Sequence, residues 1–259
     1  MNSLKNNIVM ITGATAGIGE ATAKEFAAHG AHLILIGRRE DRLKKLCQHL
    51  KKDHGVNCLP LVIDVRDADS VAKIPGMLGK EWRSIDILIN NAGLGRGLDK
   101  IYQGNIEDWN EMLDTNVKGL LFVSRAVLPG MVERNRGHVI NVGSVAGHEV
   151  YPGGNVYCAT KHAVDALTNG MRIDLVDTAV RVSTVDPGLV ETEFSVVRFK
   201  GDEAKAKKPY ENLKPLVAED IAEIIAFIAS RPSHVNINEV IVMPKSQATA
   251  TITHRVVKP

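Results

Sequence analysis

The chain has 259 residues, 44% of them hydrophobic, and a formal net charge of +2. This size suits one domain over residues 1–259 with a substantial core, and the near-neutral charge argues against nucleic acid or an anionic membrane as partner. No apolar run approaches the ~20 residues of a bilayer span, and residues 1–7 do not resemble a signal peptide, so we expect a cytoplasmic protein without membrane contact.

Short apolar runs alternate with longer helical patterns along the chain. Several runs are apolar on both faces, as is typical of parallel strands covered by helices. The alternation predicts an α/β fold, a Rossmann-type doubly wound parallel sheet of about seven strands with helices on both faces. The expected strands are Ile8–Ile11, His32–Ile36, Leu59–Ile63, Ile85–Ile89, Val139–Val142, Val180–Val185 and Val240–Met243. The expected helices are Gly17–His29, Arg39–Asp53, Ala68–Leu78, Ile106–Asn135, Asn155–Val176 and Ala218–Ser230.

A glycine-rich turn lies between the first expected strand and the first expected helix. Gly13 permits a tight turn, Gly17 lets backbone approach a pyrophosphate, and Gly19 lets helix and strand pack closely. The helix N-terminus then offers N–H groups to phosphates. The alternative is an ordinary turn. The residues of this turn expected to bind a dinucleotide are Gly13, Thr15, Ala16, Gly17, Ile18 and Gly19.

Two arginines, Arg38 and Arg39, follow the second expected strand, where an NAD site usually has an acidic residue. Arginine suits a phosphate bidentately, so the pair favours NADP over NAD. The alternative is that both merely begin a solvated helix. The ends of the third and fourth strands are also expected to line the cofactor, because ligands of open α/β sheets bind there. These residues are Asp64, Val65, Asn91, Ala92 and Gly93.

The segment after Gly153-Gly154 places Tyr157 and Lys161 four positions apart, with Ser144 upstream. On a helix, such positions share a face. An ammonium beside a phenol favours the phenolate and lowers the phenol pKa from its usual ~10, which allows proton exchange with a carbonyl or alcohol near neutral pH. Taken alone, the pair is more often a packed aromatic ring and a surface amine.

Cysteine and histidine positions give no metal or disulfide signature. Cys47, Cys58 and Cys158 are odd in number and without motif spacing, which predicts free thiols in a reducing compartment. The histidines have no metal-ligand spacing with each other or with the cysteines, so we expect no metal site.

The motifs together resemble the short-chain dehydrogenases/reductases over nearly the whole chain. The shared residues, in order and spacing, are Thr12–Gly19, Asn90–Gly93, Asn116, Ser144, Tyr157, Lys161 and Pro187-Gly188. A closer resemblance is to the bacterial NADP-dependent 3-hydroxy acid dehydrogenases, which also oxidise serine and L-allo-threonine and reduce malonic semialdehyde. It is carried by Arg134–His138, Gly153–Tyr157, Glu193–Asp202 and His234–Asn238.

The resemblance implies specific catalytic roles. Tyr157 would be the acid/base, Lys161 would hold the nicotinamide ribose and lower the phenol pKa, and Ser144 would bind the substrate oxygen. Asn116 would organise a water that relays protons to Lys161. Asn116 lies within an expected long helix, and an Asn in the middle of a helix often disturbs it. The alternative is that Asn116 has a packing or capping role. The residues bordering the nicotinamide would be Pro187, Gly188, Val190 and Thr192. Family members are commonly homotetramers, which is expected here by analogy.

The substrate side is predicted from residues 190–215, a segment without strong periodicity that suits a lid. Between Arg198 and Lys214 there are six basic and three acidic residues. A lid with surplus positive charge suits a small carboxylate, with Arg198 as a bidentate partner; the alternative is a solvated, mobile segment. We therefore expect substrate contacts from Ser144, Tyr157 and Arg198, and no role is predicted for the C-terminal tail, residues 246–259.

These observations predict an NADP-dependent oxidoreductase that interconverts a small 3-hydroxy acid, such as serine, L-allo-threonine or 3-hydroxypropionate, and its 3-oxo acid. One alternative is a related reductase for 3-oxoacyl thioesters, ketones or sugars, because the same catalytic residues serve all of these. Another is a non-catalytic NADP-binding sensor. The presence of Ser144, Tyr157, Lys161 and Asn116 together argues against the sensor.

Overall fold

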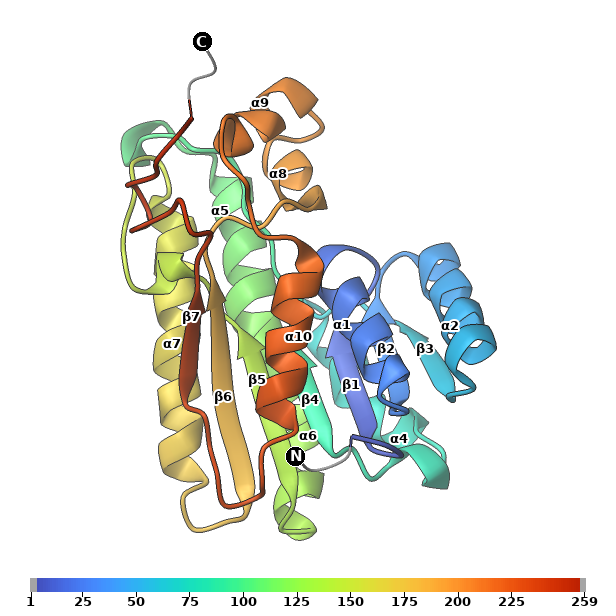
Figure 1. Cartoon of the computed structure of the whole chain (residues 1–259). Coiled ribbons are helices and arrows are strands. Elements are labelled where there is room, and N and C mark those ends of the chain that lie inside the picture. Colours follow the sequence, from blue (N-terminus) through green and yellow to red (C-terminus); the bar gives the residue numbers. More distant parts are fainter. Residues whose placement is uncertain (1–3, 257–259) are drawn as a thin grey trace.

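The computed structural model describes residues 4–256, which build one seven-stranded sheet with helices on both faces (Figure 1). The strand order is β3-β2-β1-β4-β5-β6-β7, and each neighbouring pair is parallel. The predicted doubly wound parallel sheet is therefore confirmed. The strands are β1 (Ile8–Thr12), β2 (His32–Gly37), β3 (Cys58–Val62), β4 (Ile87–Asn90), β5 (Gly137–Val142), β6 (Val180–Pro187) and β7 (Glu239–Val242).

The central strands are buried on both faces because their residues are apolar at successive positions. In β1, Val9 and Ile11 pack into one core layer with the helices α1 (Gly17–Ala28), α2 (Glu40–His54) and α10 (Ala218–Ala229). Met10, between them, points into the opposite layer. That second layer is covered by α3 (Ala68–Ala72), α4 (Ile74–Met77), α6 (Leu120–Glu133) and α7 (Asn155–Asp174). In the described part of the chain, no helix is both long and apolar enough to cross a bilayer.

Two expected helices are interrupted in the structure. The segment predicted as Ile106–Asn135 consists of α5 (Ile106–Leu113), a π-helix over Asp114–Gly119 labelled η3, and α6. Asn116 lies within the π-helical turn, which agrees with the expected disturbance and is typical of functional sites. The segment predicted as Ala68–Leu78 is divided into α3 and α4, because Pro75 lies in the first turn of α4 and has no N–H to continue the preceding helix.

Residues 190–215, expected to lack regular structure, contain short helices. These are α8 (Glu193–Arg198), α9 (Glu203–Lys207) and the 3₁₀ turn η5 (Lys208–Tyr210). Each has too few residues for a hydrophobic period to be visible in sequence. The helices α8 and α9 lie beyond the carboxyl ends of the strands, with the C-terminal segment beside them (Figure 1).

The C-terminal tail contacts this helical segment, since the Val256 N–H donates to the Asn212 carbonyl at 2.8 Å. It also contacts the region after β6, where Gln247 Oε1 accepts the Leu189 N–H at 2.8 Å. The last residues of the predicted tail, 257–259, lie outside the described residues.

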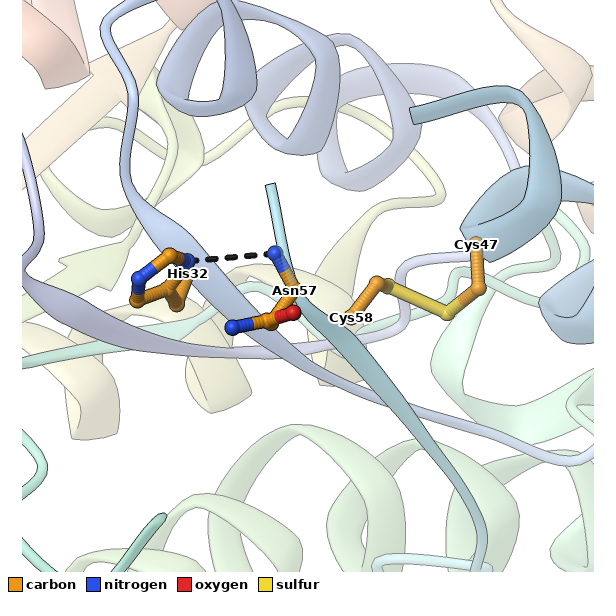
Figure 2. The surroundings of a disulfide bond; sticks show 4 residues. All are labelled: His32, Cys47, Asn57 and Cys58. Carbon is orange, nitrogen blue, oxygen red and sulfur yellow. Dashed lines mark hydrogen bonds between the residues drawn. A yellow bond between two sulfur atoms is a disulfide. The ribbon is translucent and has the colours of Figure 1, made fainter. Parts of the chain in front are cut away.

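The expectation of free thiols is wrong for two of the three cysteines. Cys47 on α2 and Cys58 at the start of β3 form a disulfide, with their Cα atoms 5.3 Å apart (Figure 2). Gly55 at the end of α2, in left-handed backbone with φ 68°, reverses the chain and returns it beside the helix. The number and spacing of the cysteines do not show that the chain returns beside α2, so they could not predict the disulfide. Cys158 is a free, buried thiol.

Candidate active site

The glycine turn after β1 provides an open helix N-terminus at the carboxyl edge of the sheet. Gly13 and Gly17 have positive φ of 67° and 53°, a conformation that other residues rarely adopt. A Cβ at Gly19 would lie 2.4 Å from the Gly13 carbonyl oxygen, so helix and turn pack too closely for any side chain. Ala16 provides no side-chain cap to α1, and the first-turn N–H groups are available to an anion. Thr15 and Ile18 lie in the same turn. The arrangement fits a dinucleotide pyrophosphate.

The two predicted arginines lie beside this turn. Arg39 donates from Nε to Thr15 Oγ1 at 3.0 Å and from Nη1 to Glu193 at 3.0 Å. Arg42, which sequence reasoning missed, donates to both Glu193 carboxylate oxygens at 2.8 and 3.0 Å. Arg38 is half exposed, with its Nη1 3.7 Å from Asp64 Oδ2. The guanidinium groups of Arg39 and Arg42 thus converge on a carboxylate, as they would on a phosphate.

The residues after β4 lie next to the glycine turn, whereas Asp64, after β3, lies near Arg38. Asn91 donates to the Thr12 carbonyl at 3.0 Å, and the Ala92 N–H donates to Thr12 Oγ1, also at 3.0 Å. Asp64 is held by Arg66, whose charge and hydrogen bonds outweigh partial burial and keep the pKa of Asp64 below its ordinary value. Val65, the neighbour of Asp64, is buried.

Ser144, Tyr157 and Lys161 come together where β5 ends and α7 begins, and Asn116 lies beside them. Lys161 is buried, and its Nζ donates to the Val142 carbonyl at 2.8 Å. Asn116 Nδ2 donates to the Leu94 carbonyl at 2.8 Å and to Thr160 Oγ1 at 3.0 Å. A methyl group on Gly93 would lie 3.3 Å from Asn116 Oδ1 and 3.8 Å from Lys161 Nζ, so that glycine leaves these polar atoms approachable.

The pKa values differ from the expectation based on helical spacing. Burial raises the pKa of Tyr157 above its ordinary value, and the lowering influences of Arg198 and of the Ser144 hydroxyl are smaller. Burial lowers the pKa of Lys161 to about 8, opposed by the charge of Asp186. In this arrangement the amine hydrogen-bonds to a backbone carbonyl and desolvation of the phenol dominates. The lowering of the phenol pKa by Lys161 stays a prediction.

The segment after β6 brings the remaining predicted cofactor residues to the same edge. Pro187 ends β6, and its carbonyl accepts from Ser144 Oγ at 3.4 Å. The Gly188 N–H donates to the Val242 carbonyl at 2.8 Å. Val190 is buried, and Thr192 caps α8; its Cβ would lie 3.2 Å from a Cβ on Gly17.

Arg198, at the end of α8, lies over the candidate acid/base. Its guanidinium carbon is 4.7 Å from the centre of the Tyr157 ring and 4.9 Å from that of Phe194. Its Nη2 donates to the Tyr151 hydroxyl at 3.1 Å. Its Nε is buried and has no hydrogen-bond partner among the described residues. An unpaired buried donor beside Tyr157 is suited to a substrate anion.

A further polar cluster, which sequence reasoning missed, lies behind Ser144. His148 Nε2 is 3.2 Å from Asp186 Oδ2 and 3.1 Å from Glu239 Oε1. Within residues 4–256, these three side chains form a group whose ligand atoms lie within 4.8 Å of one another and could hold a metal ion. Their wide separation in sequence leaves no spacing signal. The prediction of no metal site stays a prediction.

Comparisons with known proteins identify the family. A family model described as short chain dehydrogenase matches residues 7–203. The chain belongs to the short-chain dehydrogenase family.

Close relatives cover nearly all of the chain. The NADP-dependent 3-hydroxy acid dehydrogenase of Salmonella typhi is 51% identical over 250 residues, 96% of this chain and 99% of that protein. The enzyme of that name from Schizosaccharomyces pombe is 45% identical over 256 residues, 98% of this chain and 99% of that protein. A closed form of serine dehydrogenase complexed with NADP⁺ superimposes with a TM-score of 0.90 at 47% identity, covering 96% of this chain and 100% of that one.

The predicted family and enzyme class are thereby confirmed: the chain is an oxidoreductase that acts on hydroxyl groups. The NADP preference predicted from Arg38 and Arg39 agrees with the NADP dependence of these relatives. The roles predicted for individual site residues stay predictions.

Proposed function

We propose that this enzyme is an NADP-dependent dehydrogenase that interconverts a small 3-hydroxy acid and its 3-oxo acid, with serine, L-allo-threonine and 3-hydroxypropionate as candidate substrates. The observation that carries the substrate class is Arg198, whose buried Nε lacks a partner and whose guanidinium lies over the Tyr157 ring. A substrate carboxylate bound there would bring its hydroxyl-bearing carbon close to the phenol. The names of the relatives support the same substrate class and cofactor.

In this mechanism, the protein handles the proton and orients the reactants. The bound cofactor would supply the redox chemistry, with its oxidised form as hydride acceptor in alcohol oxidation and its reduced form as hydride donor in carbonyl reduction. Tyr157 takes the hydroxyl proton in oxidation and donates it to the carbonyl oxygen in reduction. Ser144 binds the reacting oxygen, and Lys161 and Asn116 connect the phenol to a proton path. The raised pKa of Tyr157 favours the protonated phenol, which is the form that reduction requires.

The cofactor would lie along the carboxyl edge of the sheet. The α1 N-terminus would hold the pyrophosphate, because its first-turn N–H groups have no side-chain cap. Arg38, Arg39 and Arg42 would bind the 2′-phosphate, with Arg39 and Arg42 exchanging the Glu193 carboxylate for it. Residues 190–215 would act as a lid, since α8 contacts both the phosphate region through Glu193 and the catalytic tyrosine through Arg198.

The test of substrate class follows the absorbance of reduced nicotinamide with NADP and four alcohols: L-serine, L-allo-threonine, 3-hydroxypropionate and a secondary alcohol without a carboxylate. We expect turnover mainly with the three carboxylates. In Arg198→Ala, KM should rise at least tenfold for the acids and change little for the neutral alcohol. Equal kcat/KM for all four alcohols, or an equal rise in KM, would instead favour a general carbonyl or thioester reductase.

Cofactor preference is measured in the same assay. We expect kcat/KM to be higher with NADP than with NAD, and Arg38→Asp to weaken NADP more than NAD. Equal kcat/KM for both cofactors in the wild-type enzyme would remove the proposed preference.

We propose a homotetramer located in the cytoplasm. Support for assembly comes from a mostly apolar groove between α6 and α7. It is lined by Leu121, Leu128, Pro129, Val132 and Met171, together with the polar residues Ser124, Arg125 and Glu133. In a cytoplasmic protein, the Cys47–Cys58 pair would face a reducing glutathione pool. Cell fractionation, together with alkylation of free thiols at the moment of lysis, tests the location and the state of this pair.

A further inference from the structure

Asp186 is a buried carboxylate that is fixed directly against the backbone of Ser144. It lies in β6 with 3% of its surface exposed. Its Oδ1 accepts the Ser144 N–H at 3.1 Å and the Thr184 hydroxyl at 2.9 Å. A Cβ at Gly143 would lie 1.8 Å from this oxygen, so the end of β5 approaches the carboxylate closely. The backbone position of Ser144 is thus set by Asp186.

The second oxygen of Asp186 is braced from outside the sheet. Oδ2 lies 3.2 Å from His148 Nε2, and the same nitrogen lies 3.1 Å from Glu239 Oε1. His148 follows the 3₁₀ turn η4 (Val145–Gly147), whereas Glu239 begins β7, which pairs with β6. Nε2 carries at most one hydrogen, and Asp186 Oδ2 has no aligned hydrogen-bond partner among the described residues. The imidazole therefore lies within ion-pair distance of both carboxylates without an aligned hydrogen bond to Oδ2.

The hydroxyl of Ser144 has few other partners, and one of them is the phenol of Tyr157. Its Oγ accepts the Ala146 N–H at 3.1 Å, and its contact with the Pro187 carbonyl is long, at 3.4 Å. The direction of the hydroxyl therefore depends on where the Ser144 backbone lies. A loosened Asp186 would move a group that must meet the substrate oxygen within hydrogen-bond distance.

We propose that Asp186, braced by His148 and Glu239, is a positioning residue that holds Ser144 in its geometry for catalysis. The inference rests on the role proposed above for Ser144. His148 would thereby contribute to catalysis through Asp186, without direct contact with the phenol or the cofactor turn. His148, Glu239 and Lys161 are the charged or titratable groups that act on Asp186, from η4, β7 and α7.

The experiment compares His148→Ala with His148→Gln, alone and in a Ser144→Ala background. Gln places an N–H donor near Asp186 Oδ2 in place of the imidazole, whereas Ala places none there. We expect kcat to fall roughly tenfold in His148→Ala, with most of the loss recovered in His148→Gln and KM for NADP unchanged. In the Ser144→Ala background, His148→Ala should cause no further loss, because the group that it positions is gone.

Assay conditions keep the outcomes separate. EDTA is present throughout, so that no metal ion bridges the cluster, and excess enzyme in single turnover makes the slow Ser144→Ala reaction measurable. An unchanged kcat in His148→Ala, or an equal fold-loss with and without Ser144, would overturn the proposal; an equal loss would point to a direct effect on Lys161. The comparison of single and double variants uses whichever alcohol the wild-type enzyme oxidises. Its result therefore does not depend on whether the proposed substrate class is correct.

Asp186 variants provide a second measurement on the same oxygen. Asp186→Asn keeps an acceptor for the Ser144 N–H, whereas Asp186→Ala removes it. We expect the loss in kcat to be larger for Ala than for Asn by several fold, and a comparable loss in both would contradict the positioning role. Affinity for NADP, measured by binding, shows whether each variant is folded.

Discussion

At the scale of single residues, burial controls the chemistry of the candidate site. Tyr157 and Lys161 share a helix face, yet Lys161 Nζ donates to the Val142 carbonyl. Burial raises the pKa of Tyr157 and lowers that of Lys161, so it favours the neutral form of each side chain. A protonated phenol is suited to donate to a carbonyl oxygen. The site therefore begins in the form needed for reduction.

Tyr157→Phe should remove the proton donor while keeping the aromatic packing against Phe194. We expect kcat to fall about 10³-fold, within the range of general acid–base catalysis, with little change in NADP binding. Steady-state kinetics with NADP checks this. The matched control is Tyr102→Phe, an exposed tyrosine, which should leave kcat unchanged; full activity in Tyr157→Phe would remove the assigned role.

Lys161→Met should stabilise the fold at neutral pH. The pKa of Lys161 is lowered from 10.5 in the unfolded chain to about 8 by burial, so the folded state binds fewer protons between these values and wild-type stability rises with pH across that window. Below pH 8 the buried ammonium costs about 3 kcal/mol. Unfolding by urea should show this gain at pH 7 and its disappearance near pH 10.5. Lys118→Met, at an exposed lysine, is the control.

At the scale of elements, α8 connects the phosphate region to the catalytic residues. Its first residue, Glu193, pairs with Arg39 and Arg42, and its last, Arg198, lies over the Tyr157 ring. A ligand that takes the arginines away from Glu193 would release one end of this short helix. The position of the proposed lid and NADP binding at the proposed site would thus be coupled through the six residues of α8.

Glu193→Gln should therefore tighten NADP binding, because the carboxylate competes with the 2′-phosphate for the same guanidinium groups. We expect Kd for NADP to fall about threefold, with a smaller change for NAD, since the pairs are half exposed and weakly stabilising. Titration at low and high salt checks this, and the difference should shrink at high salt. Glu191→Gln, at the neighbouring exposed carboxylate, should leave Kd unchanged.

The disulfide between α2 and β3 should stabilise the elements that carry the arginines. Cys47 and Cys58 are 11 positions apart, so the bond restricts a short loop and contributes about 3 kcal/mol by the chain-entropy relation. The double variant Cys47→Ser/Cys58→Ser should unfold at lower urea concentration by a matching amount. Dithiothreitol should reproduce this loss in the wild-type protein and leave the double variant unaffected. An unchanged midpoint would show that the bond adds no stability.

At the scale of the whole molecule, the sheet gathers every candidate site residue at one edge. The parallel strands end together, and the loops after β1, β4, β5 and β6 meet there. Residues as far apart in sequence as Thr12 and Asn91, or Ser144 and Asp186, are therefore in contact. The proposed assembly surface lies elsewhere, on α6 and α7. Leu121 and Val132 are 38% and 39% exposed along that groove.

Leu121→Arg should disrupt the proposed tetramer, because a charge in an apolar interface lacks a partner and stays desolvated. Light scattering coupled to size exclusion should give a tetramer mass for the wild-type protein and a smaller mass for the variant. Met77→Arg, at an exposed residue of α4, should keep the wild-type mass. A monomeric wild-type protein at micromolar concentration would contradict the proposal.

The sequence by itself determined the parallel sheet and most of the candidate site. Runs apolar on both faces, glycines that need positive φ, and Tyr157 with Lys161 are local patterns, and each can be interpreted without knowing what packs against it. Asn116 even indicated the disturbed helix that the structure shows as a π-helical turn.

Only the tertiary structure decided the features that depend on separate elements meeting. Examples are the Cys47–Cys58 bond, the Glu193 contacts with Arg39 and Arg42, and the cluster around Asp186. The direction of the Tyr157 pKa belongs here too, since it follows from desolvation by the whole fold. Periodicity and turn chemistry act over a few neighbouring residues, whereas burial and contacts across the sheet are set by packing, which no short stretch of sequence records.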